Sequence, residues 1–219
     1  MKIAVAIIWR PTSERERAFR HVSAQYRALF PDAPIIAADA GGVGFSRAES
    51  RNVAMRSCSD YDVVILSDAD CVLAHDTNIN AAVVAATGDP KLHLPYTAQH
   101  YCTAEETELV YGGDSRPLPG WEGTGACYVV TPAVWEACGG MDHRFGPHWG
   151  GEDDALYAAA TALTGIRRHY GTVLSLHHAD EDRPIGSPSQ VKNHQLSHRY
   201  HLAREDPNAI RAIIEERTS

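Results

Sequence analysis

The chain has 219 residues, of which 44% are hydrophobic and 22% are charged. These proportions are ordinary for a folded globular protein, and they exclude a disordered or fibrous chain. The 28 acidic and 20 basic side chains give a formal net charge of −8, which disfavours a protein that coats DNA or RNA. No stretch approaches about 18 consecutive apolar residues, so we expect no transmembrane helix.

The amino-terminal run and the cysteines bear on the cellular compartment. The first ten residues resemble a signal peptide superficially, but their apolar run is short and no small-residue cleavage site follows, so a buried strand is the better interpretation. The five cysteines form no Cys-x-x-Cys pair, which argues against a disulfide framework or a cysteine zinc site. We therefore expect a reducing compartment, the cytoplasm.

Strand and helix patterns alternate in the first part of the chain. Apolar segments predict buried strands at residues 2–9, 35–38 and 62–67. A first helix is predicted to open at the capping box Ser13-x-x-Glu16 and to carry on one face the residues Phe19, Val22, Tyr26 and Leu29. Further helices are predicted at residues 46–58 and 77–86.

The second part of the chain continues this alternation after a long irregular stretch. Residues 96–125 are rich in Gly, Pro, Thr and acids, and we expect loops around an acceptor site there. The later predicted elements are a strand at 128–130, a helix opened by Pro132, a helix at 152–163, a strand at 172–177 and a polar helical segment at 188–217. This order suggests a parallel sheet with helices on both faces.

Ligands bind beyond the carboxyl ends of the strands in such sheets, where Asp39 and Asp68 are expected. Asp68 and Asp70 follow directly on a buried strand. Two carboxylates at this edge would repel each other without a cation, so the pair predicts a divalent metal ion that also binds substrate phosphates. The alternative is a helix cap or a surface turn.

A second chemical signal is the segment Trp149-Gly150-Gly151-Glu152-Asp153-Asp154. Three acids at a helix start can serve simply to complement the helix dipole. Here two glycines allow close approach of a ligand, and a tryptophan offers a face for a sugar ring. A carboxylate beside them is suited to take a proton from a sugar hydroxyl.

Three motifs resemble, in this order, those of β-1,4-galactosyltransferase-type enzymes: Phe45-x-Arg47-Ala48-x-x-x-Asn52-Val53, Ser67-Asp68-Ala69-Asp70 and the segment 149–154. Gly139-Gly140-Met141-Asp142-x-x-Phe145 resembles a Gly-Gly-Phe-Asp-x-x-Phe segment of the same enzymes. More broadly, residues 2–178 resemble the GT-A glycosyltransferase fold, including the galactosyltransferase-like C-terminal module.

The resemblance implies a GT-A fold of the α/β class, Rossmann-like and typical of nucleotide-diphospho-sugar transferases. Its sheet would be mixed but mainly parallel, with helices on both faces. A catalytic domain would cover residues 1–185, and a helical tail at 186–219 would pack on or over the active site.

The resemblance also implies a metal site and a donor site. Asp70 would be the direct ligand of Mn²⁺ (or Mg²⁺), joined by a histidine after the late strand, His178 in preference to His177. UDP-galactose is the first expectation for the donor. On the donor side the resemblance implies that Asp39, Arg47 and Asp68 contact the nucleotide and that Asn52 supports the helix. Further candidates for nucleotide-sugar binding are Trp9, Arg10, Gly150 and Gly151, and Arg199 is a candidate to contact the diphosphate from a lid helix.

On the acceptor side, Asp153 matches the family's inverting catalytic base. Glu152 and Asp154 would bind acceptor hydroxyls or brace the base, and Trp149 would line the junction of donor and acceptor. Trp121 is a candidate stacking platform for a sugar, with a buried core position as the alternative.

Several features depart from the family or stay open. His148 precedes Trp149 where vertebrate-type members have Gly, and their Met-x-x-His segment is not found. His194, His198 and His201 have the spacing of a zinc-binding helix face, although a solvated or lid helix is the favoured interpretation. The stem and membrane anchor of Golgi enzymes are also not found, so we expect a soluble bacterial or bacteriophage enzyme.

Together these inferences predict an inverting, metal-dependent glycosyltransferase that moves a hexose from a UDP-sugar to a hydroxyl of a carbohydrate or other acceptor. Nucleic acid is a disfavoured partner. One alternative is a nucleotidyltransferase or sugar-nucleotide hydrolase on a similar fold. The stretch after the first strand, residues 9–13, lacks the glycines of a triphosphate-binding loop and counts against it. Another alternative is a non-catalytic carbohydrate-binding protein.

Overall fold

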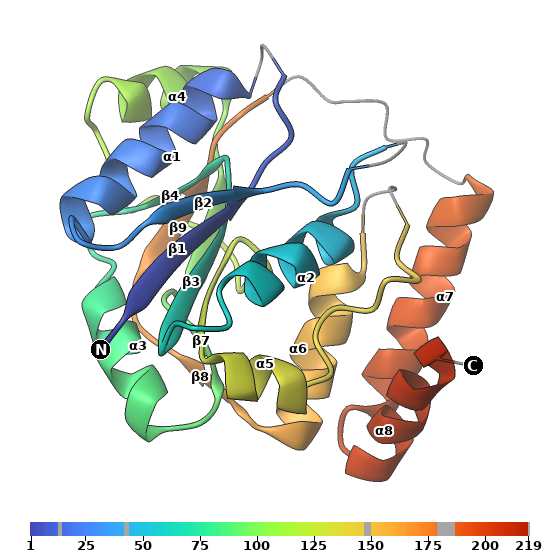
Figure 1. The fold of residues 1–219 in the computed structure, drawn as a ribbon. Coiled ribbons are helices and arrows are strands. Elements are labelled where there is room, and N and C mark those ends of the chain that lie inside the picture. The colour runs from blue at the N-terminus through green and yellow to red at the C-terminus, as the bar shows by residue number, and fades with distance from the viewer. Residues whose placement is uncertain (13–14, 42–43, 147–149, 179–186, 219) are drawn as a thin grey trace.

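The computed structural model describes residues 1–12, 15–41, 44–146, 150–178 and 187–218. Its centre is a six-stranded sheet in the order β2-β1-β3-β7-β5-β8 (Figure 1). Five of these strands run in one direction, and β7 is antiparallel to both of its neighbours. A second sheet has the order β4-β9-β6.

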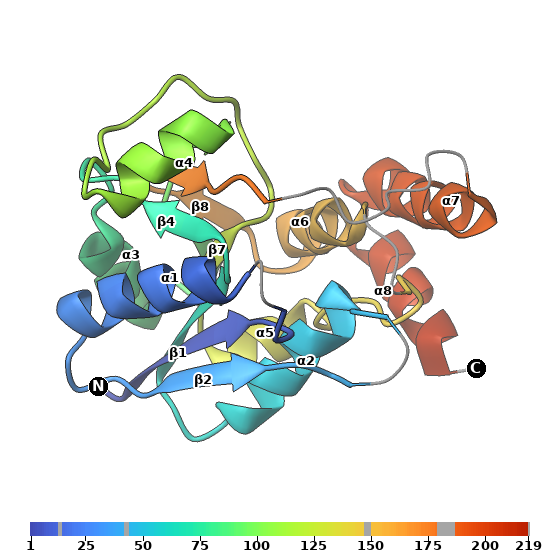
Figure 2. The same cartoon turned by 90° about the horizontal axis from the view of Figure 1, so that it is seen from above.

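The first elements match their predictions closely. They are β1 (Ile3–Ile8), α1 (Glu16–Leu29), β2 (Ile35–Ala38), α2 (Arg47–Ser57) and β3 (Val63–Asp68). The connections β1→β2 and β2→β3 run in opposite directions across the sheet, so right-handed crossovers place α1 and α2 on opposite faces (Figure 2). Because both faces are covered, β1 and β3 read as continuous apolar runs, and Ala4–Ile7 and Val63–Leu66 are fully buried.

The remaining elements complete the two sheets and their covering helices. They are β4 (Cys71–Leu73), α3 (Ile79–Gly88), β5 (Leu92–Leu94), β6 (Ala98–Tyr101), α4 (Ala104–Tyr111), β7 (Cys127–Val130), α5 (Pro132–Ala137), α6 (Glu152–Leu163), β8 (Ile166–Arg168), β9 (Thr172–Ser175), α7 (Pro188–Ala203), α8 (Pro207–Glu215) and a 3₁₀ turn at Glu216–Thr218.

Several expectations about the secondary structure are wrong. The stretch 96–125, expected to be loops, contains β6 and α4, and α4 begins at a capping box between Thr103 and Glu106. The carboxy-terminal helical segment is divided in two at Pro207. Leu29, placed on the buried face of α1, is 40% exposed. Ser13 lies outside the described residues, and Arg15 stands at the N-cap without a side-chain cap.

The carboxyl ends of the first three strands meet at one edge of the sheet. Ile8 pairs with Ala38 on one side and with Asp68 on the other. This register brings the loops after β1, β2 and β3 together and places the Asp68 side chain at the edge where ligands bind. None of the helices in the described part of the chain is long and apolar enough to span a membrane.

The carboxy-terminal helices are anchored to the loop 139–145 through a buried carboxylate. Tyr200 on α7 donates its hydroxyl to Asp142 Oδ2 at 3.0 Å, and both residues are buried. Arg217 contacts the Tyr200 hydroxyl and donates to the Gly139 carbonyl at 2.6 Å. Burial raises the pKa of Asp142, but hydrogen bonds from Arg144 outweigh it and hold this pKa below its usual value.

Replacing Tyr200 with Phe should lower the free energy of unfolding by about 1–3 kcal/mol, because one buried hydrogen bond to Asp142 and one to Arg217 are lost. Urea unfolding measures the change. Tyr170→Phe is the matched control, since Tyr170 is 76% exposed and should leave stability unchanged. Equal stability of the Tyr200→Phe variant and the native protein would contradict the anchoring role.

Candidate functional site

Two cavities lie side by side at the carboxyl edge of the sheet. The first, of about 370 Å³, is lined by Trp9, Asp70 and His178 among others. The second, of about 340 Å³, is lined by residues that include Trp121, Gly125 and the acidic start of α6. Four residues line both cavities and so mark their boundary: Arg47, Asp68, Gln99 and Tyr101.

The backbone brings Asp70 and His178 together in the first cavity. Asp70 precedes β4 and His178 follows β9, and these two strands pair in antiparallel fashion. His178 Nε2 lies 3.1 Å from Asp70 Oδ2. Burial raises the pKa of Asp70, but the hydrogen bond and charge of His178 outweigh it and keep this pKa below its usual value. His177 also lines the cavity, but it is exposed and its backbone N–H donates to Thr107.

The side chains around Asp70 and His178 have the chemistry of a divalent metal site. Asp68, Asp70 and Cys71 each offer a ligand atom, and these atoms lie within 4.8 Å of one another. Carboxylate oxygens and an imidazole nitrogen are ligands that Mn²⁺ accepts readily. The residues at this end of the cleft therefore fit a bound Mn²⁺ or Mg²⁺ ion.

A buried arginine, missed by the sequence analysis, joins the two cavities. Arg51 on α2 is 1% exposed. Its Nη2 lies 2.6 Å from Asp68 Oδ1, and its Nη1 lies 2.8 Å from Asp153 Oδ1. Arg51 shares the core-facing side of α2 with Ala48 and Met55, both buried, and a lone charge on such a face is a signal that could have found it.

The two oxygens of Asp153 have different surroundings. Oδ1 accepts a hydrogen bond from Arg51 and lies 2.7 Å from the Tyr128 hydroxyl. Oδ2 has no hydrogen-bond partner among the described residues and faces Gly125. A Cβ atom at position 125 would lie 2.5 Å from Oδ2, so only glycine leaves this oxygen room. One oxygen is thus held by two side chains, and the other lies against Gly125, which lines the second cavity together with Asp153.

The two acids beside Asp153 also differ in environment. Glu152 is 5% exposed, and burial together with the charge of Asp153 raises its pKa to about 7. Asp154 is more exposed and accepts a hydrogen bond from the Thr124 hydroxyl at 2.7 Å. Burial likewise raises the pKa of Asp68 to about 6, despite the opposing charge of Arg51. Asp68, Glu152 and Asp153 are therefore all near one cation, the Arg51 guanidinium.

An aromatic pair lies at the mouth of the second cavity. Trp121 and Tyr101 stack with ring centroids 5.0 Å apart, and they are 54% and 50% exposed. This exposure rules out the buried core position considered for Trp121. Two parallel exposed rings at the edge of a cavity form a flat apolar surface.

Other residues named from the sequence lie at varying distances from the cleft. Trp9 lines the first cavity and stacks on Phe19, and Gly150 and Gly151 line the second. Within the described residues, four of the named side chains line neither cavity: Arg10, Asp39, Asn52 and Arg199. Trp149 lies outside the described residues.

These four side chains make other contacts. Arg10 and Asp39 pair with each other at 2.7 and 2.9 Å. Asn52 exchanges hydrogen bonds with the backbone of Met141. Arg199 is paired with Glu216 at 2.6 Å, so it does not reach the first cavity.

The three histidines of α7 do not form a metal cluster in the described structure. His194, His198 and His201 are exposed, and His194 borders the second cavity. The solvated-helix interpretation therefore describes this face of α7 better than the zinc-binding one.

Comparison with known proteins gives matches at the level of structure. No protein-family model and no curated protein matches the sequence. The catalytic domain of Drosophila β1,4-galactosyltransferase 7 with xylobiose has a TM-score of 0.59 at 17% identity, over 88% of this chain and 79% of that one. A mutant of the same Drosophila enzyme with manganese, UDP-Gal and xylobiose has a TM-score of 0.58 at 15% identity over the same shares.

A third similar structure is GalNAc-T7 with UDP, GalNAc and Mn²⁺. Its TM-score is 0.57 at 11% identity, over 99% of this chain and 55% of that one. At such identities the likeness shows the fold, and the predicted GT-A glycosyltransferase fold is confirmed.

Replacing Arg51 with Met should lower the free energy of unfolding by about 3–5 kcal/mol at pH 8, because Asp68 and Asp153 lose their shared cation. The loss should be smaller at pH 5, because the pKa of Asp68 is raised to about 6 and this carboxylate can take up a proton there. Arg51→Lys should restore only part of the stability, since one ammonium cannot bridge two carboxylates as a guanidinium does.

The matched control for Arg51 is Arg56→Met on the same helix. Arg56 is exposed and pairs with Glu49, so its loss should change stability by no more than about 0.5 kcal/mol. Urea unfolding at both pH values measures the series. Equal, pH-independent effects of the two methionine variants would contradict the bridging role of Arg51.

Proposed function

We propose that this protein is an inverting, metal-dependent glycosyltransferase that transfers a hexose from a UDP-sugar to a hydroxyl of an uncharged acceptor. The observation that carries the proposal is the position of Asp153 Oδ2. Asp153 lines the cavity beside the one that holds Asp70 and His178, and its Oδ2 makes no hydrogen bond within the described residues. Asp68 and Arg47 lie at the boundary of the two cavities.

The first cavity is suited to the nucleotide diphosphate. Asp70 and His178 would hold a Mn²⁺ or Mg²⁺ ion, whose chemistry is to neutralise the charge of the diphosphate leaving group. Arg47 lines both cavities and makes no hydrogen bond or ion pair within the described residues, so its guanidinium can contact phosphate oxygens. The structural neighbours that hold UDP-Gal or UDP together with manganese support this proposal, and UDP-galactose remains the first candidate donor.

Asp153 is the proposed base. Its Oδ2 accepts the proton of the acceptor hydroxyl, and the hydroxyl oxygen attacks the anomeric carbon from the face opposite the diphosphate. Arg51 and Tyr128 hold Oδ1, so the carboxylate keeps its orientation through the reaction. Asp153 acts across the boundary between the cavities, where donor and acceptor would meet.

The lining of the second cavity indicates the class of acceptor. It carries five acidic side chains, Asp68, Glu122, Glu152, Asp153 and Asp154, against Arg47 and His194. An anionic acceptor would be repelled, whereas a neutral sugar can stack on Trp121 and donate hydroxyl protons to the carboxylates. We therefore propose a neutral saccharide as acceptor, with Glu152 and Asp154 as the flanking hydrogen-bond acceptors.

The metal assignment predicts a difference between two adjacent histidines. A UDP-sugar with Mn²⁺ at about 100-fold above its Kd should raise the Tm by about 5 °C or more, and the UDP-sugar alone should raise it less. His178→Ala should remove the Mn²⁺-dependent part of this rise. His177→Ala is the matched control and should keep it, because His177 is exposed whereas His178 contacts Asp70.

A panel of nucleotide sugars, each with and without Mn²⁺, also tests the proposed function itself. A Tm rise with one UDP-sugar names the donor. A panel with no rise for any nucleotide would contradict the glycosyltransferase proposal. Loss of the rise in His177→Ala alone would instead move the metal to the other histidine.

Asp153→Asn should lower kcat by a factor of about 10²–10⁴, because the variant has no general base, while the donor-induced Tm rise persists. Product formation and thermal unfolding measure the two properties on the same sample. Asp60→Asn, at an exposed turn, is the control and should change neither. Transfer at the native rate by Asp153→Asn would show that another group takes the proton.

A further inference from the structure

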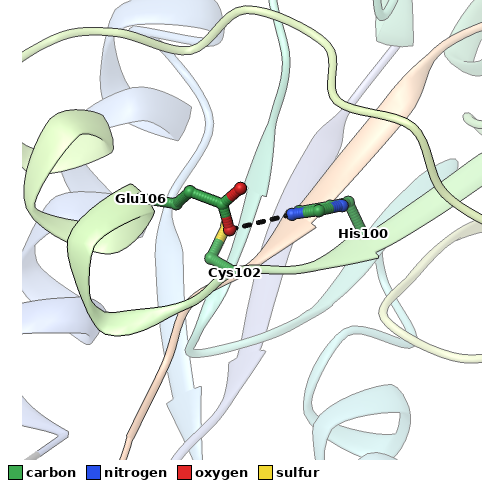
Figure 3. Close-up of side chains that lie close together, drawn as sticks. All are labelled: His100, Cys102 and Glu106. Carbon is green, nitrogen blue, oxygen red and sulfur yellow. Dashed lines mark hydrogen bonds and ion pairs between the residues drawn. The ribbon is translucent and has the colours of Figure 1, made fainter.

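A second cluster of metal-ligating side chains lies where β6 leads into α4. His100, Cys102 and Glu106 each bring one ligand atom to within 4.8 Å of the others (Figure 3). His100 and Glu106 line neither cavity of the cleft, and Cys102 only borders the first. The proposed transfer reaction uses none of the three.

The ring of His100 is oriented so that one nitrogen faces the cluster. Its Nδ1 lies 2.7 Å from the Pro119 carbonyl, which can only accept, so Nδ1 carries a proton. Its Nε2 lies 3.1 Å from Glu106 Oε2, which is also an acceptor. Two lone pairs at this distance repel each other, so the contact requires an extra ring proton or a bound cation. A carbonyl on the far nitrogen is how metal-bound histidines are commonly oriented.

The other two side chains have ligand atoms to spare. Cys102 is 5% exposed, and its sulfur has no hydrogen-bond partner among the described residues. Burial raises the pKa of this thiol to about 11, so a metal ion would have to displace its proton. Glu106 Oε2 accepts the Thr103 N–H in the capping box, which leaves Oε1 with no hydrogen bond in the described part of the chain.

We propose that His100, Cys102 and Glu106 bind a zinc ion. Nitrogen, sulfur and oxygen together form a donor set that suits Zn²⁺ and is too soft for Mg²⁺. A tetrahedral zinc site separates its ligand atoms by about 3.5 Å, so modest side-chain rotations close the cluster, and water completes the fourth position. This site does not depend on the proposed transferase activity.

The zinc ion would brace the aromatic pair at the second cavity. Tyr101 stands between two of the ligands in sequence and stacks on Trp121. The His100 ring holds the Pro119 carbonyl, two residues before Trp121. Trp121 also pairs its backbone with Gln99 on β6. An ion on His100 would therefore fix the strand and the loop that carry the two rings.

Cobalt provides the test, because a cysteine thiolate bound to Co²⁺ absorbs strongly in the near ultraviolet. The metal-free 219-residue chain should develop this band with one equivalent of Co²⁺ and lose it when Zn²⁺ is added. Cys102→Ser should abolish the band. Cys71→Ser is the matched control and should keep the cobalt band. Cys71 lies beside Asp70, so its thiolate would give the band only if Co²⁺ bound in the cleft instead.

A second variant, His100→Asn, tests the site independently in case Cys102→Ser does not fold. His100→Asn keeps an N–H for the Pro119 carbonyl, removes Nε2, and should weaken Co²⁺ and Zn²⁺ binding at least tenfold. No band in the folded native protein would overturn the proposal and leave a plain imidazolium–carboxylate pair. A band lost in Cys71→Ser but kept in Cys102→Ser would overturn it too, and would assign the thiolate to the cleft.

Discussion

One buried guanidinium sets the geometry on which the whole cleft depends. Arg51 reaches from α2 to Asp68 at the end of β3 and to Asp153 at the start of α6. In the sequence, Asp68 lies 17 residues and Asp153 lies 102 residues from Arg51, and the fold brings these three segments together. Removing Arg51 would leave two largely buried carboxylates without their shared cation, and removing either aspartate would break one of the two links between the segments.

The same arrangement leaves the cleft with an excess of negative charge. Asp68, Glu152 and Asp153 surround one arginine, and the pKa values of Asp68 and Glu152 are raised as a result of burial and neighbouring charge. Such a field favours a divalent cation and a ligand that donates hydrogen bonds. Arg51 also fixes which oxygen of Asp153 is engaged, so the cation that links the three segments also orients the carboxylate that we propose as the base.

The sequence predicted the long central strands of the fold better than its short strands. β1 and β3 were predictable because strands buried on both faces are continuous apolar runs. β4, β5 and β8 have three residues each, too few for a periodic pattern. The Thr103-x-x-Glu106 capping box is present in the sequence, and it would have predicted the start of α4. The motifs indicated Asp70, Asp153 and a late histidine, but Arg51 escaped notice because its partners are distant in sequence and only the fold reveals them.

The segment between α4 and β7 carries Trp121 and reaches the cleft from outside the central sheet. Asp70 and His178, by contrast, are fixed by the pairing of β4 with β9. The metal-binding residues of the first cavity therefore lie on paired strands, whereas part of the second cavity is lined by a connecting segment, which tolerates substitution better. Substitutions of exposed side chains in this segment, such as Trp121 and Glu122, can change the lining of the second cavity without altering the pairing of β4 with β9. Under the proposed function, related proteins that differ in this segment would modify different acceptors while using the same sugar donor.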